Sequence, residues 1–164
     1  MTDGVDLFNA LSTEEAERRL YSCFANRAWA VRVAAGRPFH DLTGLLASAE
    51  SAWSELVAAD WLETFAAHPR IGERGGHSPS SSEREQSQIN QASGETLAAL
   101  AAENRHYEER FGHVFLISAS GRSAEEMLEA LRQRMGNDSA TELQVAAGEQ
   151  RKIARLRLEQ LLKT

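Results

Sequence analysis

Three short stretches of the chain hold residues whose types and spacing could do chemistry, and the first is His68-Pro69-Arg70-Ile71-Gly72. A proline disfavours helical geometry in the residue before it, so a helix is predicted to stop near His68. A histidine ring held there, free of the helix, could transfer a proton near neutral pH. The same position also suits a histidine that only interacts with the last carbonyls of a helix. Spacing alone leaves both interpretations open.

The second stretch is Ser82-Glu83-Arg84-Glu85-Gln86. Ser82 and Glu85 are three residues apart, which is the spacing of a capping box, so they could simply fix the start of a helix. Alternatively, Ser82, Glu85 and Gln86 would direct a hydroxyl, a carboxylate and an amide to one place beyond the helix N-terminus. Both interpretations stay open here as well.

The third candidate is Arg157, in the predicted last helix. On a helical wheel it falls within the apolar arc that is formed by Leu143, Ala146, Ala147, Ile153, Ala154 and Leu161. A buried guanidinium must be paired, because an unpaired buried charge is costly. Its partner is therefore either an internal carboxylate or an anionic ligand. The forked donors of arginine suit planar carboxylates and ureides.

Composition limits the classes of protein to which these residues can belong. The 164 residues are 42% hydrophobic and 26% charged, as in an ordinary globular domain with one substantial core. The formal net charge of -6 argues against nonspecific attraction to nucleic acid or anionic membranes. An anionic small molecule would need a local basic group, and Arg157 is a candidate for that role.

Metal sites, disulfides and membrane segments are not expected. The one cysteine, Cys23, excludes an internal disulfide and a multi-cysteine metal site, and we expect it to be buried. His106 and His113 are seven residues apart, which does not match a helical metal pair. No apolar run approaches the roughly 20 residues that span a bilayer. The N-terminal residues lack a signal-peptide pattern, so a cytoplasmic location is expected.

The elements that would position these residues are predicted to be helices. The first is predicted to begin at Ser12, with Glu15 completing a capping box. Further helices are predicted at 28–35, 41–56, 61–67, from about 82 to a break near 94, and at 96–110, 123–135 and 140–162. The residues 70–81 are predicted to form a mobile loop. Trp29, Trp53 and Trp61 are expected in the core.

The apolar run 114–118 is the one strand candidate. Because no second strand candidate exists to pair with it, we expect an extended or helical buried segment instead. The predicted architecture is therefore all-α, a single-domain bundle of about seven or eight helices over residues 1–164.

Taken together, the motifs resemble those of a known family, the 2-oxo-4-hydroxy-4-carboxy-5-ureidoimidazoline (OHCU) decarboxylases. The similarity begins with the stretches 68–72 and 82–86 and covers most of the chain in the family's order. It continues through Asn104-x-x-Tyr107-x-x-x-Phe111-Gly112, Phe115, Gly121-Arg122, Arg134-Met135-Gly136-Asn137-Asp138, Glu142 and Lys152-Ile153-Ala154-x-Leu156-Arg157-Leu158. The combination is specific, whereas each motif alone is not.

The resemblance implies an activity and a set of site residues. Members have an all-α fold, use no metal or organic cofactor, are commonly homodimers, and convert OHCU to (S)-allantoin and CO2 in urate catabolism. A functional link to 5-hydroxyisourate hydrolase, the preceding enzyme, is implied too. The implied catalytic residues are His68 as acid and base, Glu85 and Arg157. The implied substrate-binding residues are Pro69, Ser82, Gln86, Leu116, Ile117 and Ala119.

Two other functions stay open at this stage. One is a noncatalytic helical interaction module, in which His68 and Arg157 are structural. The other is a ureide amidohydrolase, which would release ammonia or a ring-opened acid instead of CO2. The absence of metal-ligand spacing argues against the amidohydrolase.

Overall fold

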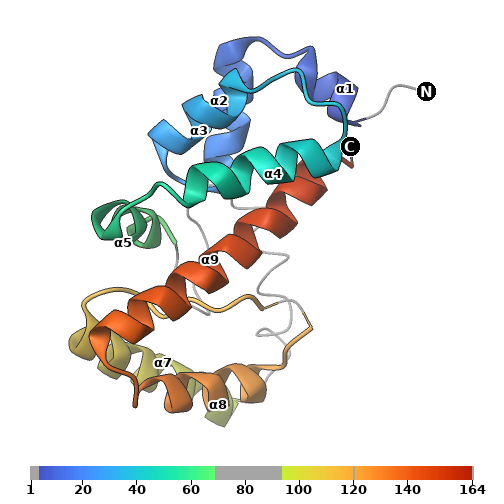
Figure 1. Ribbon diagram of the computed structural model, residues 1–164. Helices are drawn as coiled ribbons and strands as arrows, with labels where there is room; N and C mark the ends of the chain where they lie inside the picture. Colours follow the sequence, from blue (N-terminus) through green and yellow to red (C-terminus); the bar gives the residue numbers. More distant parts are fainter. Residues whose placement is uncertain (1–3, 69–93, 120, 164) are drawn as a thin grey trace. The chain divides into compact units, whose positions relative to one another are not determined.

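The computed structural model describes residues 4–68, 94–119 and 121–163, and all regular structure in these ranges is helical (Figure 1). Eight helices are present there, which confirms the predicted all-α fold. In chain order they are α1 Gly4–Asn9, α2 Thr13–Cys23, α3 Arg27–Ala35, α4 Leu42–Trp53, α5 Ala58–Ala66, α7 Gly94–Phe111, α8 Ala124–Arg134 and α9 Ser139–Leu161. Within these ranges, no helix is long and apolar enough to cross a membrane.

The chain divides into two compact units. The first comprises residues 1–64 and 154–164, and the second comprises residues 65–153. Helix α9 therefore contributes its last turns to the first unit and its beginning to the second. The single domain predicted for residues 1–164 stays a prediction.

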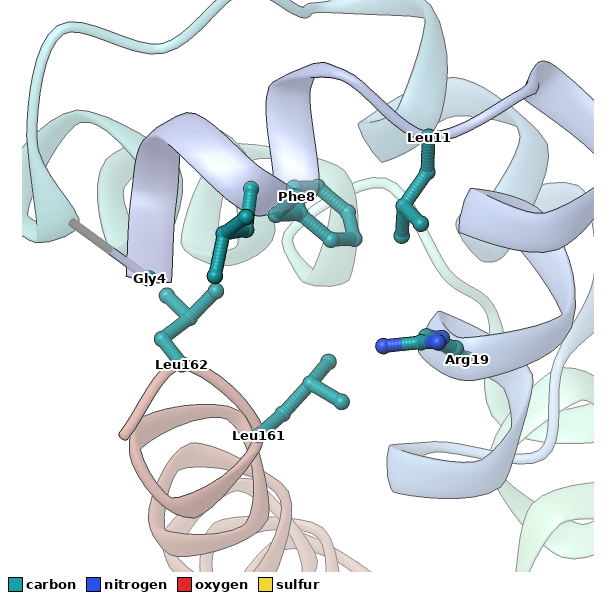
Figure 2. Close-up of a pocket in the computed structure, with 7 residues that line it drawn as sticks. Gly4, Phe8, Leu11, Arg19, Leu161 and Leu162 are labelled. Atoms are coloured by element: carbon teal, nitrogen blue, oxygen red, sulfur yellow. The ribbon is translucent and has the colours of Figure 1, made fainter. Parts of the chain in front are cut away.

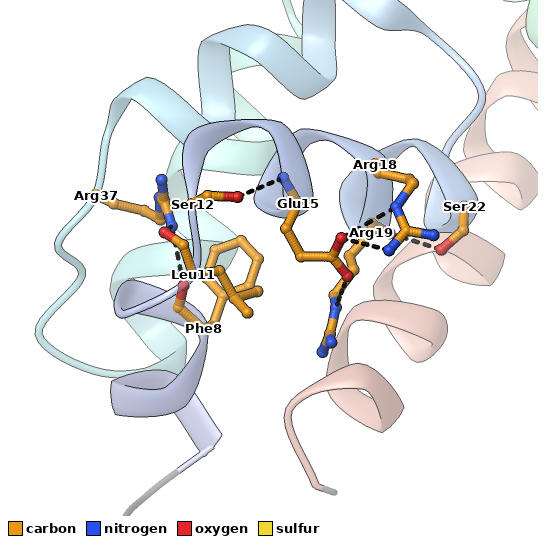
Figure 3. Close-up of polar contacts among 8 residues, drawn as sticks. All are labelled: Phe8, Leu11, Ser12, Glu15, Arg18, Arg19, Ser22 and Arg37. Carbon is orange, nitrogen blue, oxygen red and sulfur yellow. Dashed lines mark hydrogen bonds and ion pairs between the residues drawn. The ribbon is translucent and has the colours of Figure 1, made fainter.

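In the first unit, α2, α3 and α4 begin at side chains that cap them. Ser12, Asn26 and Asp41 each accept a hydrogen bond from the backbone N–H three residues ahead. At Ser12, however, the predicted capping box is only half present. The Glu15 carboxylate accepts hydrogen bonds from Arg18 and Arg19 (Figure 3). The i,i+3 and i,i+4 cations are close enough to hold it away from the helix start.

A helix begins at Ser12 as predicted, but it is not the first in the chain, because α1 precedes it. This helix is short, and it buries only Val5 and Phe8. Its end is stabilised by a residue far away in the sequence. Arg37 donates to the carbonyls of Phe8 at 3.0 Å and Leu11 at 2.8 Å (Figure 3). Such distant partners leave no local pattern in the sequence.

The core of the first unit is aromatic, as the apolar surroundings of the tryptophans predict. Trp29 and Trp53 stack with ring centroids 5.6 Å apart, and Phe24 packs against both. Trp61 closes the cluster from α5, at 5.4 Å from Phe24. Cys23, which precedes Phe24 in the sequence, is buried, as expected. Helix α4 stops at Trp53, three residues before the predicted end.

The second unit is built on α7 and α8, which pack against each other (Figure 1). Its core consists of Leu100, Tyr107, Phe115, Ile117, Ala124, Met127, Leu128 and Leu131. Helix α8 begins with a complete capping box between Ser123 and Glu126, which was not among the predicted caps. The run 114–118 is not a strand. It is irregular and largely buried, as predicted.

Candidate active site

His68 lies just beyond the end of α5, where the following proline was predicted to stop the helix. Its N–H donates to the Phe65 carbonyl at 3.1 Å, and its side chain is half-buried. The Phe65 ring packs against His113, with centroids 5.1 Å apart. The backbone before His68 is thereby placed beside the start of the segment 113–119, which contains three of the predicted substrate-binding residues.

That segment is fixed by hydrogen bonds to its backbone from two other elements. Arg134 of α8 donates from Nη1 to the Leu116 carbonyl at 2.6 Å. The N–H of Ser118 donates to the Glu149 carboxylate of α9 at 3.0 Å. Leu116, Ile117 and Ser118 are each less than a tenth exposed. The two anchors therefore hold a buried, irregular backbone in one conformation.

The arginine anchor is itself held by a buried carboxylate. Glu142 is fully buried and accepts hydrogen bonds from Arg134, from the Tyr107 hydroxyl and, at 3.0 Å, from Asn137. Burial, followed by the bond to Glu142, raises the pKa of Tyr107 far above its usual range, so the phenol keeps its proton and donates. The motif residues Tyr107, Arg134, Asn137 and Glu142 thus form one buried hydrogen-bond network, and Arg134 connects it to the Leu116 carbonyl.

The carboxylate anchor, Glu149, is surrounded by cations. Lys152 approaches it at 2.6 Å and Arg122 at 3.7 Å. Burial alone would raise the pKa of Glu149, but the hydrogen bonds from Lys152 and the Ser118 N–H outweigh it and lower the pKa below 4.5. The group is therefore ionised near neutral pH and acts as a fixed acceptor.

Between the two anchors, the backbone N–H and C=O of one residue lack hydrogen-bond partners among the described residues. Among the described residues, the N–H and C=O of Ile117 make no hydrogen bond. Buried backbone groups are nearly always paired, so a partner outside the described residues is expected here. A neighbouring donor and acceptor on one residue match an amide or ureide, which offers the complementary pair.

The other predicted site residues have different outcomes. Arg157 lies in α9 and is 4% exposed, which confirms that the guanidinium stands on a buried face. It belongs to the first unit. Pro69, Ser82, Glu85 and Gln86 lie outside the described residues, as does the predicted loop 70–81. Their roles remain predictions.

A hollow of about 240 Å³ in the first unit does not coincide with the predicted site (Figure 2). It lies between α1 and the end of α9, and Arg19 is its one charged lining residue. The other lining residues are Gly4, Leu7, Phe8, Leu11, Leu161 and Leu162. Because Arg19 already pairs with Glu15, this hollow offers an apolar surface and little chemistry.

In the part of the chain that the structure describes, no three His, Cys, Asp or Glu side chains are grouped as metal ligands would be. The two buried carboxylates, Glu142 and Glu149, are each bound by a cation of the chain itself. What the described residues of the second unit offer is hydrogen bonding along a fixed backbone and a histidine at a helix end.

Comparison with known proteins places the chain in a class and then in a family. The fold defines an all-α protein. The family model described as OHCU decarboxylase matches residues 9–159 of the chain. The chain belongs to the OHCU decarboxylase family.

Individual relatives agree with this assignment. The 2-oxo-4-hydroxy-4-carboxy-5-ureidoimidazoline decarboxylase of Amia calva is 34% identical over 142 residues, which cover 81% of this chain and 79% of that protein. The uric acid degradation bifunctional protein TTL of Arabidopsis thaliana is 32% identical over 92% of this chain. The chain spans only 48% of the length of the Arabidopsis protein.

A solved structure is similar over nearly its whole length. It is a crystal structure of an OHCU decarboxylase in the presence of (S)-allantoin, with a TM-score of 0.79 and 33% identity. The similarity covers 90% of this chain and 99% of that chain. The predicted family and fold are thereby confirmed.

Proposed function

We propose that this protein decarboxylates OHCU to (S)-allantoin and CO2. The observation that carries the proposal is the segment 116–119, which is anchored from α8 and α9. Among the described residues, the N–H and C=O of Ile117 in this segment make no hydrogen bond. A ureide can pair with both groups. Family membership supplies the particular substrate, and the crystal structure with (S)-allantoin supports the product.

The substrate needs little from the protein in the way of electronic assistance. OHCU carries a carboxylate and a hydroxyl on one ring carbon, next to an imine-like carbon. When the bond to CO2 breaks, its electron pair moves into this conjugated group. The imine nitrogen, which receives the electron pair, takes up a proton. The hydroxyl then loses its proton to become a carbonyl, and the neighbouring carbon gains one. Because the substrate is its own electron sink, the protein has to orient it and move protons.

The site residues follow from these steps. His68 is the proposed acid and base, because the reaction moves protons near neutral pH. Arg157 and Gln86 would fix the substrate, and Glu85 would hold its hydroxyl. Pro69 and Ser82 would line the pocket, and the backbone from Leu116 to Ala119 would contact the ring.

The products distinguish this proposal from its alternatives. OHCU generated in situ from urate should give CO2 and allantoin in equal amounts, faster than without the protein. Release of ammonia without CO2 would indicate a ureide amidohydrolase. If the rate equals the spontaneous decay, the chain is a noncatalytic module.

We also propose that the protein acts as a homodimer in the cytoplasm and takes its substrate from a 5-hydroxyisourate hydrolase. The support is that members of the family are commonly homodimers and act after that hydrolase. Analytical ultracentrifugation should give twice the 18.1 kDa of one chain. A mass of one chain at micromolar concentration would contradict the dimer.

A further inference from the structure

Glu149 is a buried carboxylate of α9 that contacts the chain on both sides of a turn. It is 7% exposed. Its Oε1 atom accepts the hydrogen bond from the Ser118 N–H at 3.0 Å and lies 3.7 Å from Nη1 of Arg122. The N–H of Arg122 donates in turn to the Ala119 carbonyl at 3.1 Å, which closes the turn. One oxygen atom therefore holds the residues before and after this turn.

Two of the motifs that resemble the OHCU decarboxylase family, Gly121-Arg122 and Lys152-Ile153-Ala154, meet at this carboxylate. Lys152 donates to Oε2 of Glu149 at 2.6 Å, so the two carboxylate oxygens have different partners. The side chains of Lys152 and Arg122 are 59% and 35% exposed, whereas Ser118 is buried. The cations therefore reach solvent, and the bond to the backbone does not. Neither the two cations nor Glu149 belongs to the proposed site.

The burial of Glu149 is explained by the backbone bond better than by stability. An ion pair with a solvent-exposed lysine contributes little to stability. Moving a carboxylate out of water is costly, and an apolar side chain at the same place would not have this cost. What an apolar side chain could not supply is the charge-assisted hydrogen bond to the Ser118 N–H. The specific effect of Glu149 is thus on the position of one backbone segment.

We propose that Glu149 is a positioning residue for the decarboxylation and acts through the backbone of residues 117–119. The inference rests on the proposed function, in which the backbone from Leu116 to Ala119 contacts the ring of the substrate. A displaced segment would lose this contact in the bound substrate and in the transition state alike, so KM should rise while kcat changes little. His68, the proposed acid and base, lies outside the segment and should keep its role.

Two substitutions separate the reach of the Glu149 side chain from its charge. Glu149→Asp keeps the charge but is one carbon too short for the bond to Ser118. We expect KM for OHCU and the Kd of (S)-allantoin, measured by calorimetry, to rise about tenfold, with kcat within threefold of the wild type. Glu149→Gln keeps the reach and an oxygen that can accept this bond. Its KM and Kd should stay within threefold of the wild type.

A matched control and a measurement without ligand complete the test. Glu103→Asp shortens another carboxylate of the second unit, which pairs with Arg132 at 2.8 Å, and should change neither KM nor Kd. Hydrogen exchange of the Ser118 amide should become at least tenfold faster in Glu149→Asp and should be unchanged in Glu103→Asp. Equal thermal unfolding temperatures of the two variants would show that the exchange is local.

The contrary results are equally specific. Unchanged KM and Kd in Glu149→Asp would overturn the inference, and so would a larger rise in Glu149→Gln than in Glu149→Asp, because charge and not reach would then matter. A wild type that binds allantoin but does not decarboxylate OHCU would overturn only the proposed function, and the Kd values would still decide the role of Glu149. A wild type that does neither would overturn both.

Discussion

At the scale of single residues, the buried carboxylate of Glu142 holds the arginine that fixes the segment 113–119 of the second unit. It accepts hydrogen bonds from Tyr107, Arg134 and Asn137, and Arg134 in turn holds the Leu116 carbonyl. The arginine side chain is only 10% exposed. Its charge is tolerated because this one carboxylate neutralises it.

Removing that charge should therefore cost more than removing one of its hydrogen bonds. Glu142→Gln leaves Arg134 buried without a counter-charge, and we expect it to lower the free energy of unfolding by about 3 kcal/mol. Tyr107→Phe keeps the ion pair and should cost about 1 kcal/mol. Urea unfolding of both variants measures the difference. Equal losses would show that the ion pair is not the dominant contact.

Glu149 gives the second unit a dependence on pH. Its folded pKa is lower than its ordinary value of 4.5, so the ionised form stabilises the fold at higher pH. This contribution should be complete at neutral pH and should be lost as the pH falls below 4.5. Unfolding of the wild type and of Glu149→Gln, measured from pH 7 to pH 3, should show the two stabilities converging in acid. A constant difference across this range would contradict the assignment.

The sequence predicts some of these residues and not others, for a physical reason. Arg157 is recognisable because a charge on an apolar arc conflicts with its neighbours. Glu149 and Gln150 lie in a run of polar residues, Gly148 to Lys152, where a solvent-facing surface is the natural expectation. Their burial depends on what packs against α9, and no local pattern contains that information.

At the scale of elements, the segment 113–119 is delimited by two glycines with left-handed backbone. Gly112 directly follows the last residue of α7 and has a φ of 79°. Gly121 lies shortly before α8 and has a φ of 75°. Residues with a Cβ adopt this conformation at a cost, so the two glycines allow the chain to leave one helix and enter the next sharply.

The same substitution should have opposite effects at two glycines. Among the described residues, a Cβ at Gly112 or Gly148 would meet no atom within 4 Å, so only backbone conformation differs. Gly112→Ala should destabilise by about 1–2 kcal/mol, because its φ is left-handed. Gly148→Ala lies inside α9 and should stabilise by up to about 1 kcal/mol. Thermal unfolding with calorimetry measures both, and equal signs would contradict the backbone argument.

Helix ends that depend on neighbouring residues were predictable from the sequence, whereas contacts between residues far apart in the chain were not. The caps at Ser12 and Asp41 and the stop before Pro69 each follow from one or two residues. Helix α1 was not predicted, because the contact that stabilises its end is not local. Arg37, which donates to the Leu11 carbonyl, lies 26 residues further along the chain. The capping box was expected at Ser12 and is found at Ser123, because the carboxylate at Glu15 has competing cations.

At the scale of the whole molecule, the prediction of one domain can be tested with the protein's own fluorophores. The chain has three tryptophans, and Trp29, Trp53 and Trp61 all belong to the first unit. Tryptophan fluorescence therefore reports that unit, whereas circular dichroism reports helices of both. If residues 1–164 fold as one domain, the two urea transitions should have the same midpoint. Separate midpoints would show that the units unfold independently.

The family assignment also belongs to this scale, because it depends on motifs spread along the chain. No single stretch is diagnostic, yet their order over residues 9–159 is matched by the family model. The structure adds a reason for several of them, since the motif residues Tyr107, Arg134 and Asn137 all bind the buried Glu142 carboxylate. What it adds to the proposed chemistry is a buried backbone segment that is held from α8 and α9.

The most direct test of the central claim follows the optical activity of allantoin formed from OHCU, with wild-type protein and with His68→Asn. We expect a single enantiomer to form rapidly with the wild type, and kcat to fall by about 10²–10⁴-fold in the variant with little change in Tm. His106→Asn, at an exposed position, should match the wild type. Near-normal turnover by His68→Asn, or only slow racemic allantoin with the wild type, would contradict the account.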